Sequence, residues 1–195
     1  MQEAAKNPRF TELYQKLLEL PDQVIGEIIA GELVVSPRPA LRYSRATAKI
    51  SREIGNHFDD DGDLGGWLLL VEPELHLGEE ALVPDIAGWR HETIAEFPDE
   101  AVMSVAPDWI CEVLSPATSK RDKKEKARSY HAAGVSWYWL VSPQDRTIEA
   151  LRREVAFWVR VGLWSDDEKA RMEPFDAVEL DLSRWWKGIK PPKQD

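Results

Sequence analysis

The stretch "PDWICEVLSPATSKRDKKEKARSYHAAGVSWYWLVSP", residues 107–143, decides the fold class. Two apolar runs with strand-like composition, 107–115 and 137–143, flank a segment of helical composition at 119–134. This order predicts a strand, a helix and a second strand, with the helix folded back over the sheet that contains both strands.

One residue of the first run does not suit a buried strand. Glu112 stands in the middle of "WICEVLSP", residues 109–116. A lone ionised carboxylate in an apolar layer costs several kcal/mol unless it is paired, protonated or bound to a metal. Some other group must therefore compensate for Glu112.

The rest of the chain predicts further elements around this unit. Helical spacing of apolar residues predicts helices at 9–20 and 43–58, and strand-like runs predict a hairpin at 26–37 and strands at 67–77 and 81–90. An outer hairpin follows at 147–164, and a short closing helix or loop at 180–189. The pattern indicates an α/β (α+β) domain, a mixed central sheet flanked by helices, with 1–20 an N-terminal helix and 180–195 a C-terminal tail.

Composition limits the classes of function. The 195 residues carry a net charge of -10, which argues against a protein that coats itself with nucleic acid but leaves room for a local basic site. The basic run 120–128 is either such a site or a solvated helix face. A single cysteine, Cys111, allows no internal disulfide and is expected to be a buried apolar residue. With no signal-like or membrane-spanning segment in the sequence, we expect a soluble cytoplasmic protein.

Asp85 provides a second carboxylate on a predicted strand. It either caps a turn after Pro84 or shares a site with Glu112. Two carboxylates on adjacent strands can chelate a hard cation, and Mg²⁺ is typically held by one or two carboxylates plus substrate phosphates. Such a site would explain the burial of Glu112.

The helix after Glu112 adds a lysine to this set. Asp122, Lys126 and Tyr130 follow one another at intervals of four residues, which places them on one helical face. Lys126 can turn toward the two carboxylates, or it can be an exposed lysine paired with Asp122.

Three segments carry a family resemblance in their amino-acid sequence: "GELVVSPRPALRY", "LVPDIAGWR" and the stretch 107–143. They resemble the Uma-type family of restriction endonuclease-like proteins, a bacterial branch of the PD-(D/E)XK nuclease-like superfamily, over roughly residues 20–160. The resemblance implies a single nuclease-like domain over 1–195.

The same resemblance implies roles for particular residues. Asp85 takes the place of the motif aspartate and Glu112 that of the (D/E) element, so that both would bind the metal. Leu114 stands where the motif lysine is expected, and Lys126 is the matching lysine from the next helix. Glu32 matches a family glutamate and is a further catalytic candidate.

Three other positions qualify this resemblance. Glu74, in "EPEL", is a weaker acidic candidate than Glu32. Tyr43 replaces a histidine that relatives often carry, and Trp137 begins "WYW" where relatives often read "EYW". The loss of the histidine affects proton handling or substrate positioning, while the carboxylates and lysine remain.

Two functions follow from these observations. The first is a metal-dependent endonuclease that hydrolyses DNA phosphodiester bonds, with Mg²⁺ or Mn²⁺ as cofactor, DNA as partner and a homodimer as the expected assembly. The second is a catalytically silent module that keeps the nuclease fold for DNA binding or protein interaction. Tight metal uptake would favour the first. Nucleophilic catalysis by Ser115 or Cys111 has little support, since no base is placed beside either residue.

Overall fold

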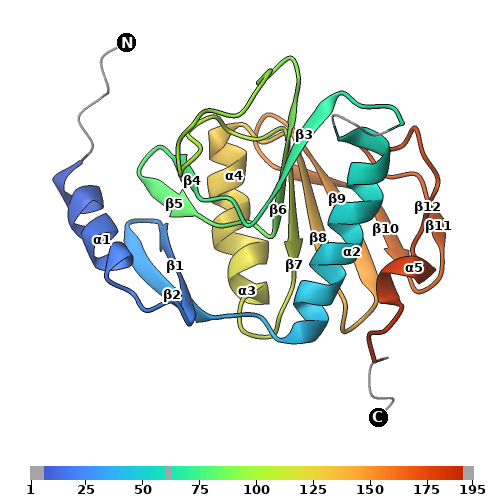
Figure 1. Cartoon of the computed structure of the whole chain (residues 1–195), viewed down its shortest axis with the longest axis horizontal. Coiled ribbons are helices and arrows are strands. Elements are labelled where there is room, and N and C mark those ends of the chain that lie inside the picture. The colour runs from blue at the N-terminus through green and yellow to red at the C-terminus, as the bar shows by residue number, and fades with distance from the viewer. Residues whose placement is uncertain (1–6, 60–62, 191–195) are drawn as a thin grey trace.

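The computed structural model describes residues 7–59 and 63–190, which form a mixed sheet with helices on both faces (Figure 1). The central sheet has the strand order β10-β9-β8-β7-β6-β3, in which β7 and β8 are parallel and the other neighbours are antiparallel. Its strands are β3 (Trp67–Val71), β6 (Ile86–Arg90), β7 (Trp109–Val113), β8 (Trp137–Ser142), β9 (Thr147–Arg153) and β10 (Trp158–Ser165). The predicted fold class is confirmed.

The segment between β7 and β8 is helical, as predicted for 119–134, but it is not one continuous α-helix. It consists of α3 (Ser119–Arg121), a π-helical turn (Asp122–Lys126) and α4 (Ala127–Ala133). Gly134 follows with φ of 94°, a left-handed conformation that glycine adopts without a steric penalty and that commonly ends helices. The chain can therefore turn directly into β8.

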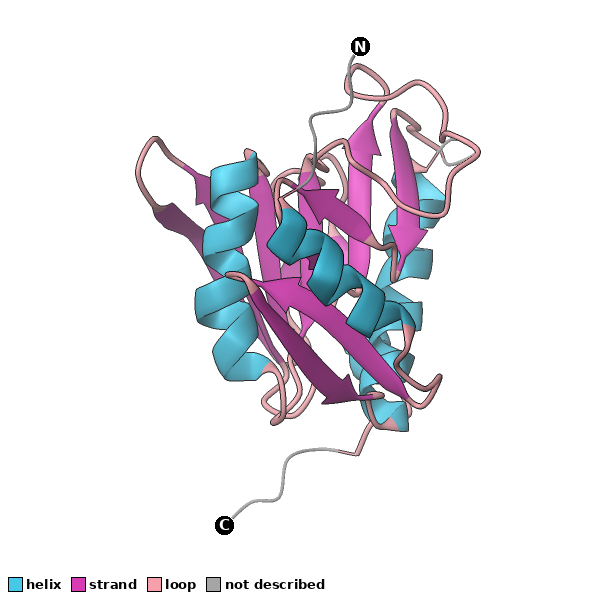
Figure 2. Ribbon diagram, turned by 90° about the vertical axis from the view of Figure 1, so that its left-hand side faces the viewer, coloured by secondary structure: helices cyan, strands magenta, loops and turns pink. Residues whose placement is uncertain are grey.

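A second, four-stranded sheet lies beside the first, with the order β2-β1-β5-β4. The predicted hairpin forms β1 (Val24–Ile29) and β2 (Glu32–Pro37), and Figure 2 shows α1 (Pro8–Leu18) crossing this sheet. Its other strands are β4 (Leu75–Leu77) and β5 (Glu80–Leu82). The single strands predicted at 67–77 and 81–90 are each divided, because Pro73 and Pro84 cannot donate a backbone hydrogen bond and interrupt the ladders.

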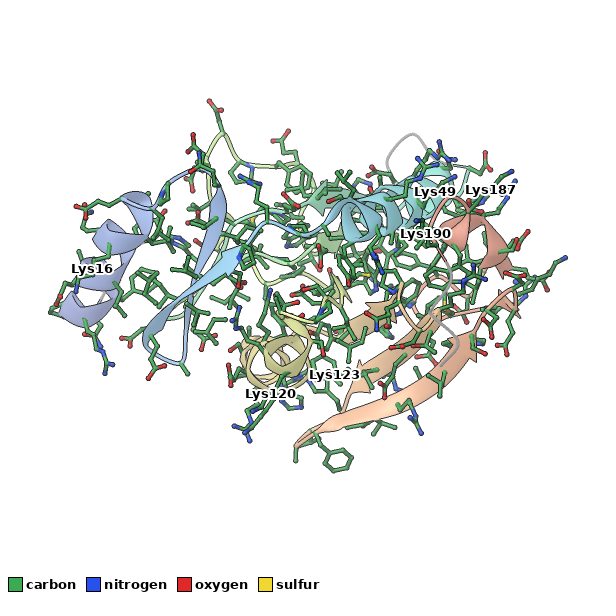
Figure 3. All side chains as sticks on the ribbon, turned by 90° about the horizontal axis from the view of Figure 1, so that it is seen from below. Lys16, Lys49, Lys120, Lys123, Lys187 and Lys190 are labelled. Atoms are coloured by element: carbon green, nitrogen blue, oxygen red, sulfur yellow. The ribbon has the colours of Figure 1, made fainter. Side chains whose placement is uncertain are left out.

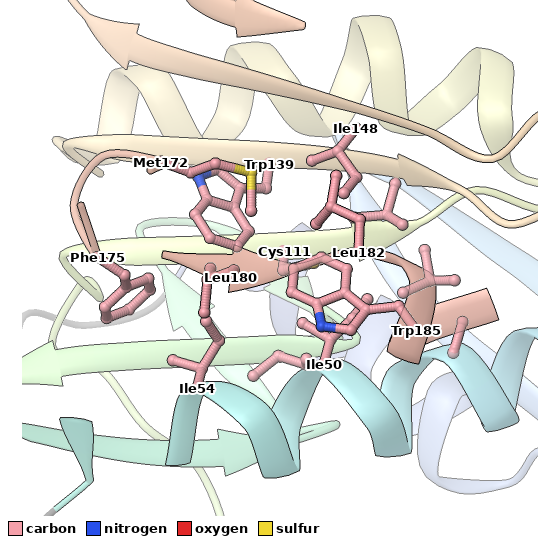
Figure 4. Packing of buried hydrophobic residues seen from close by; sticks show 14 of the residues in the cluster. Ile50, Ile54, Cys111, Trp139, Ile148, Met172, Phe175, Leu180, Leu182 and Trp185 are labelled. Carbon is pink, nitrogen blue, oxygen red and sulfur yellow. The ribbon is translucent and has the colours of Figure 1, made fainter. Parts of the chain in front are cut away.

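Two hydrophobic layers cover the two faces of the central sheet. On one face α2 (Leu41–Phe58) and α5 (Ser183–Trp186) pack on β7 and β8 through residues such as Ile50, Trp139 and Trp185 (Figure 4). On the other face Tyr130 of α4 packs against Tyr138 of β8. The fully buried Cys111 belongs to the α2 layer, as expected for an apolar residue.

The two ends of the chain lie partly outside the described residues. The predicted helix at 9–20 is α1, and the closing segment contains β12 (Leu180–Asp181), paired with β11 (Lys169–Ala170), and α5. The predicted N-terminal helix and C-terminal tail extend over 1–6 and 191–195, which are not described. Within 7–59 and 63–190, no helix is both long and apolar enough to cross a membrane.

Candidate active site

The position of Glu112 follows from the alternation of side chains along β7. The strand lies between β6 and β8, so both of its edges are paired. Trp109, Cys111 and Val113 point into the α2 layer, which leaves Glu112 on the face covered by α4. Only 3% of Glu112 is exposed, so its carboxylate needs a partner inside the protein.

Lys126 is that partner. Its Nζ lies 2.6 Å from Oε1 of Glu112 and 2.8 Å from Oε1 of Glu27, and it donates a hydrogen bond to the carbonyl oxygen of Val83 at 3.0 Å. The side chain is 2% exposed, which excludes the alternative of an exposed lysine paired with Asp122. Burial alone would lower the pKa of Lys126, but the carboxylates of Glu112 and Glu27 outweigh it and raise that pKa well above its ordinary value. Lys126 is therefore an ammonium ion at neutral pH.

The π-helical turn gives Lys126 its direction. Asp122, at the start of the turn, and Lys126, at its end, are both buried, whereas Lys123 and Lys124 between them are exposed. Tyr130, one turn later, donates its hydroxyl hydrogen bond to Oε1 of Glu112 at 2.8 Å. The prediction that Asp122, Lys126 and Tyr130 share one face is thus confirmed, and that face points into the protein.

Glu27 on β1 is a member of the cluster that the sequence reasoning missed. It is 5% exposed, and its Oε1 also accepts a hydrogen bond from the backbone N–H of Val83 at 2.9 Å. Its Oε2 lies 3.9 Å from a guanidinium nitrogen of Arg121, which donates a hydrogen bond to Ser36 at 2.7 Å. A glutamate inside the apolar strand "VIGEII" is the same signal that singled out Glu112.

Glu32, the predicted family glutamate, is not brought into this cluster. In the β1–β2 register Glu27 faces Val34 and Ile29 faces Glu32, so Glu32 lies on the same face as Glu27 but two positions closer to the turn. Two positions along a strand correspond to about 7 Å. Glu32 is exposed there, whereas Glu27 contacts Lys126 directly.

Asp85 immediately precedes β6, the strand that pairs with β7. Its Oδ2 accepts a hydrogen bond from the backbone N–H of Val113 at 2.7 Å, which fixes the carboxylate next to Glu112. Burial raises the pKa of Asp85 to about 6, against the opposing effects of that hydrogen bond, of Lys126 and of a hydrogen bond with the Glu112 side chain. Burial likewise raises the pKa of Glu112 well above its ordinary value, although the charge of Lys126 opposes it.

The positions at which the chain departs from the family have structural roles. Leu114 is 6% exposed and packs in the α4 layer, and Tyr43 is 6% exposed in the α2 layer. Trp137 packs against that layer and contacts Arg90, whose guanidinium carbon lies 5.0 Å from the centre of the ring. A lysine at position 114 would have to bury its ammonium in this apolar layer. The ammonium beside Glu112 instead comes from Lys126 of the helical segment between β7 and β8.

Glu74, the weaker candidate, belongs to a different cluster. Its Oε1 accepts the hydroxyl hydrogen bond of Tyr14 at 2.7 Å and lies 2.7 Å from Nε2 of His76. Burial and the contact with Glu74 raise the pKa of Tyr14 to about 12. This cluster joins α1 to β4 and does not line the cavity beside Asp85 and Glu112.

A cavity of about 50 Å³ gives access to the carboxylates of Asp85 and Glu112. Its lining also contains Glu27, Asp122 and Lys126. A single water needs roughly 10–15 Å³, so the cavity has room for a small cation with some of its water. It lies where two helices begin, because Pro39 and Thr118, just before α2 and α3, also line it.

The donor set fits a hard divalent cation held by few protein ligands. No group of three or more His, Cys, Asp or Glu side chains within residues 7–59 and 63–190 is arranged to hold a metal ion. Mg²⁺, however, is commonly bound by only one or two carboxylates and completes its shell with waters and substrate phosphates. Asp85 and Glu112 offer such a pair.

Comparison with known proteins identifies the family of the chain. The profile of the Uma2 family, described as "Putative restriction endonuclease", matches residues 11–183. The chain belongs to the Uma2 family. The expected resemblance is thereby confirmed.

Solved structures extend the likeness to the fold. A crystal structure from Anabaena variabilis, described as that of "a putative nuclease belonging to DUF820", is similar to this Uma2 family member with a TM-score of 0.70. The two chains are 20% identical, and the similarity covers 89% of this chain and 96% of the other. At this identity the likeness concerns the fold. No match was found among curated proteins.

Proposed function

We propose that this Uma2 family protein is a metal-dependent endonuclease that hydrolyses DNA phosphodiester bonds. The observation that carries the proposal is the excess of carboxyl groups over cations in the buried cluster. Four of them, from Glu27, Asp85, Glu112 and Asp122, line the same cavity as Lys126, and two of these, Glu27 and Glu112, contact its ammonium. One further cation, Arg121, lies 3.9 Å from Glu27. A divalent cation would balance this excess of negative charge.

Each side chain of the cluster has a distinct role in this proposal. Asp85 and Glu112 would hold Mg²⁺ or Mn²⁺, which polarises the scissile phosphate and neutralises the leaving oxygen when it is bound. The Lys126 ammonium stabilises negative charge that develops on the phosphate and orients a water. Glu27 and Tyr130 act as positioning residues, because Glu27 holds Lys126 and Tyr130 holds Glu112.

Metal titration followed by incubation with plasmid DNA tests the proposal. The wild type should take up Mn²⁺ or Mg²⁺ and nick the plasmid, whereas Asp85→Asn and Glu112→Gln should do neither. Unchanged nicking by folded Asp85→Asn protein would show that the carboxylate pair is not the catalytic centre.

The β1–β2 hairpin offers a matched pair of variants for the same assay. Glu27→Gln removes a carboxylate that contacts Lys126, so nicking should fall strongly. Glu32→Gln removes a carboxylate from the same face of the hairpin, two positions away, and should nick like the wild type. An equal loss of nicking in both variants would contradict the proposal that Glu27, and not Glu32, belongs to the site.

One contact favours the catalytically silent module as a second candidate. Lys126 lies 2.6 Å from Glu112 and already supplies a charge partner for the buried glutamate without a metal. A silent module would bind DNA or a protein without taking up Mg²⁺ or Mn²⁺ and would not nick plasmid in either metal. The titration described above separates these two functions.

We also propose a homodimer, since cleavage of both strands of a duplex requires two active sites and symmetric pairs are the commonest assembly. Light scattering coupled to size-exclusion chromatography measures the mass directly. A mass close to that of one 22.3 kDa chain at all protein concentrations would contradict this part of the proposal.

A further inference from the structure

A row of basic side chains follows the outer side of α2. Arg42, Arg45, Lys49 and Arg52, which we call the α2 basic stripe, recur every three or four residues, and this spacing places them on one face of the helix. The opposite face carries the buried residues of the core. From Arg42 to Arg52 the stripe extends about 15 Å at the α-helical rise per residue.

The α5 segment adds positive charge to this surface. Arg45 lies against Gly188, where an added Cβ would be 3.8 Å from its Nε. Figure 3 shows Lys187 close to Lys49. Desolvation and the nearby charges of Arg45, Arg52, Lys187 and Arg184 lower the pKa of Lys49, so these cations repel one another.

The charges of the stripe are not paired directly with carboxylates, although Glu53 follows Arg52 on the same helix. Within the described part of the chain, no side chain of the stripe forms an ion pair, whereas Arg184 on α5 pairs with Glu53 at 3.0 Å. Repulsion between unpaired cations destabilises the folded protein modestly. A concentration of positive charge in a protein of net charge -10 is therefore suited to an anionic partner.

The stripe begins beside the carboxylate cavity. Pro37 and Pro39 line that cavity, and α2 starts two residues after Pro39. On the other side of the cavity Ser115 and Thr118 lead into α3, where the exposed Lys120 begins the basic run 120–128. Figure 3 shows Lys120 and Lys123 well apart from Lys49, Lys187 and Lys190. A polyanion that crosses the cavity would meet positive charge on both sides.

We propose that the α2 basic stripe, with Lys187, binds the phosphate backbone of duplex DNA on the side of the cavity opposite the basic run 120–128. The identity of the polyanion rests on the proposed function. Duplex DNA carries one phosphate per strand every 3.4 Å of axis, so a stripe of about 15 Å matches roughly four base pairs. The substrate is therefore an extended duplex, held well beyond the bond that is cut.

The salt dependence of DNA binding tests this inference independently of cleavage. Anisotropy of a labelled duplex of about 30 base pairs is measured in EDTA between roughly 50 and 200 mM salt for the wild type and for Arg45→Ala/Lys49→Ala. Each phosphate contact contributes about 0.9 to the slope of log K against log salt. The double variant should therefore bind more weakly at every salt concentration, with a slope shallower by about 2.

Lys16→Ala/Arg160→Ala is the matched control, because it removes two exposed cations from α1 and β10 and changes the net charge equally. It should leave the slope unchanged. Equal slopes in the stripe and control variants, or a wild type that does not bind duplex, would overturn the inference. So would a stripe variant that binds duplex normally but no longer binds phosphatidylserine vesicles, which would assign the surface to anionic lipid.

The two proposals fail in different ways. A wild type that does not nick plasmid but shows stripe-dependent binding overturns the nuclease function and leaves the DNA surface in place. A wild type that nicks plasmid with stripe-independent binding overturns only the surface. Circular dichroism of both double variants confirms that the fold is retained.

Discussion

Replacement of Lys126 by methionine should destabilise the protein strongly at neutral pH. Methionine preserves most of the length and apolar volume of lysine but removes the ammonium, which has contacts of 2.6 Å to Glu112 and 2.8 Å to Glu27. Breaking a buried ion pair by removing one partner costs about 3–5 kcal/mol. With a urea m-value of roughly 2 kcal/mol/M, the midpoint of unfolding should fall by about 2 M.

The loss of stability in Lys126→Met should depend on pH. Burial already raises the pKa of Glu112, and without the ammonium that pKa rises further. Above the unfolded-state pKa of a glutamate, the folded variant then binds more protons than the unfolded chain, so its stability falls as pH rises. The deficit relative to the wild type should be smaller near pH 5 than near pH 8.

Urea unfolding followed by tryptophan fluorescence at both pH values measures this effect. Lys123→Met is the matched control, because Lys123 is exposed in the same π-helical turn, and it should change stability by less than about 0.5 kcal/mol. Adding Glu27→Gln and Glu112→Gln to Lys126→Met should restore part of the lost stability. A Lys126→Met protein as stable as the wild type at pH 8 would refute the ion-pair reasoning.

Three further outcomes are expected. Tyr130→Phe removes the hydrogen bond to Glu112 and should cost about 0.5–1.5 kcal/mol in urea unfolding while slowing plasmid nicking. Because burial and Glu74 raise the pKa of Tyr14, this side chain should ionise near pH 12 in an ultraviolet titration. The stability that depends on its proton should be lost as pH rises from about 10 toward 12, and a Tyr14→Phe variant should lack that late transition. Adding Leu114→Lys to Lys126→Met returns a lysine to its motif position. The double variant should unfold at lower urea than Lys126→Met and should still not nick plasmid, because Leu114 is buried in an apolar layer.

The central part of the fold was predictable because its signals are local. The apolar runs 107–115 and 137–143 are long enough to specify buried strands, and the helix between them ends at Gly134. The second sheet was not predicted, because β4 and β5 have only three residues each and the choice of sheet depends on tertiary contacts. Periodicity describes which face is buried, but not against which neighbour.

The candidate site, like the fold, was predictable only in part. Glu112 was recognised because a carboxylate in an apolar strand requires compensation, and the spacing of Asp122, Lys126 and Tyr130 correctly placed them on one face. Glu27 was overlooked although it stands in a similar strand, since the resemblance directed attention to Glu32. The register of the hairpin decides between the two glutamates, and that register is a property of the folded pair of strands.

The π-helical turn has a consequence for sequence alignment and for the exchange of segments between relatives. Such a turn contains one residue more than the α-helical turn it replaces, and each residue rotates a helix by about 100°. Removing one residue from Asp122–Lys126 would keep either the start of the turn or Tyr130 on the inward face of the helical segment, but not both. An alignment to a relative with an uninterrupted helix must therefore open a single-residue gap here. A transplanted helix that lacks the extra residue would point its lysine ammonium away from the carboxylates.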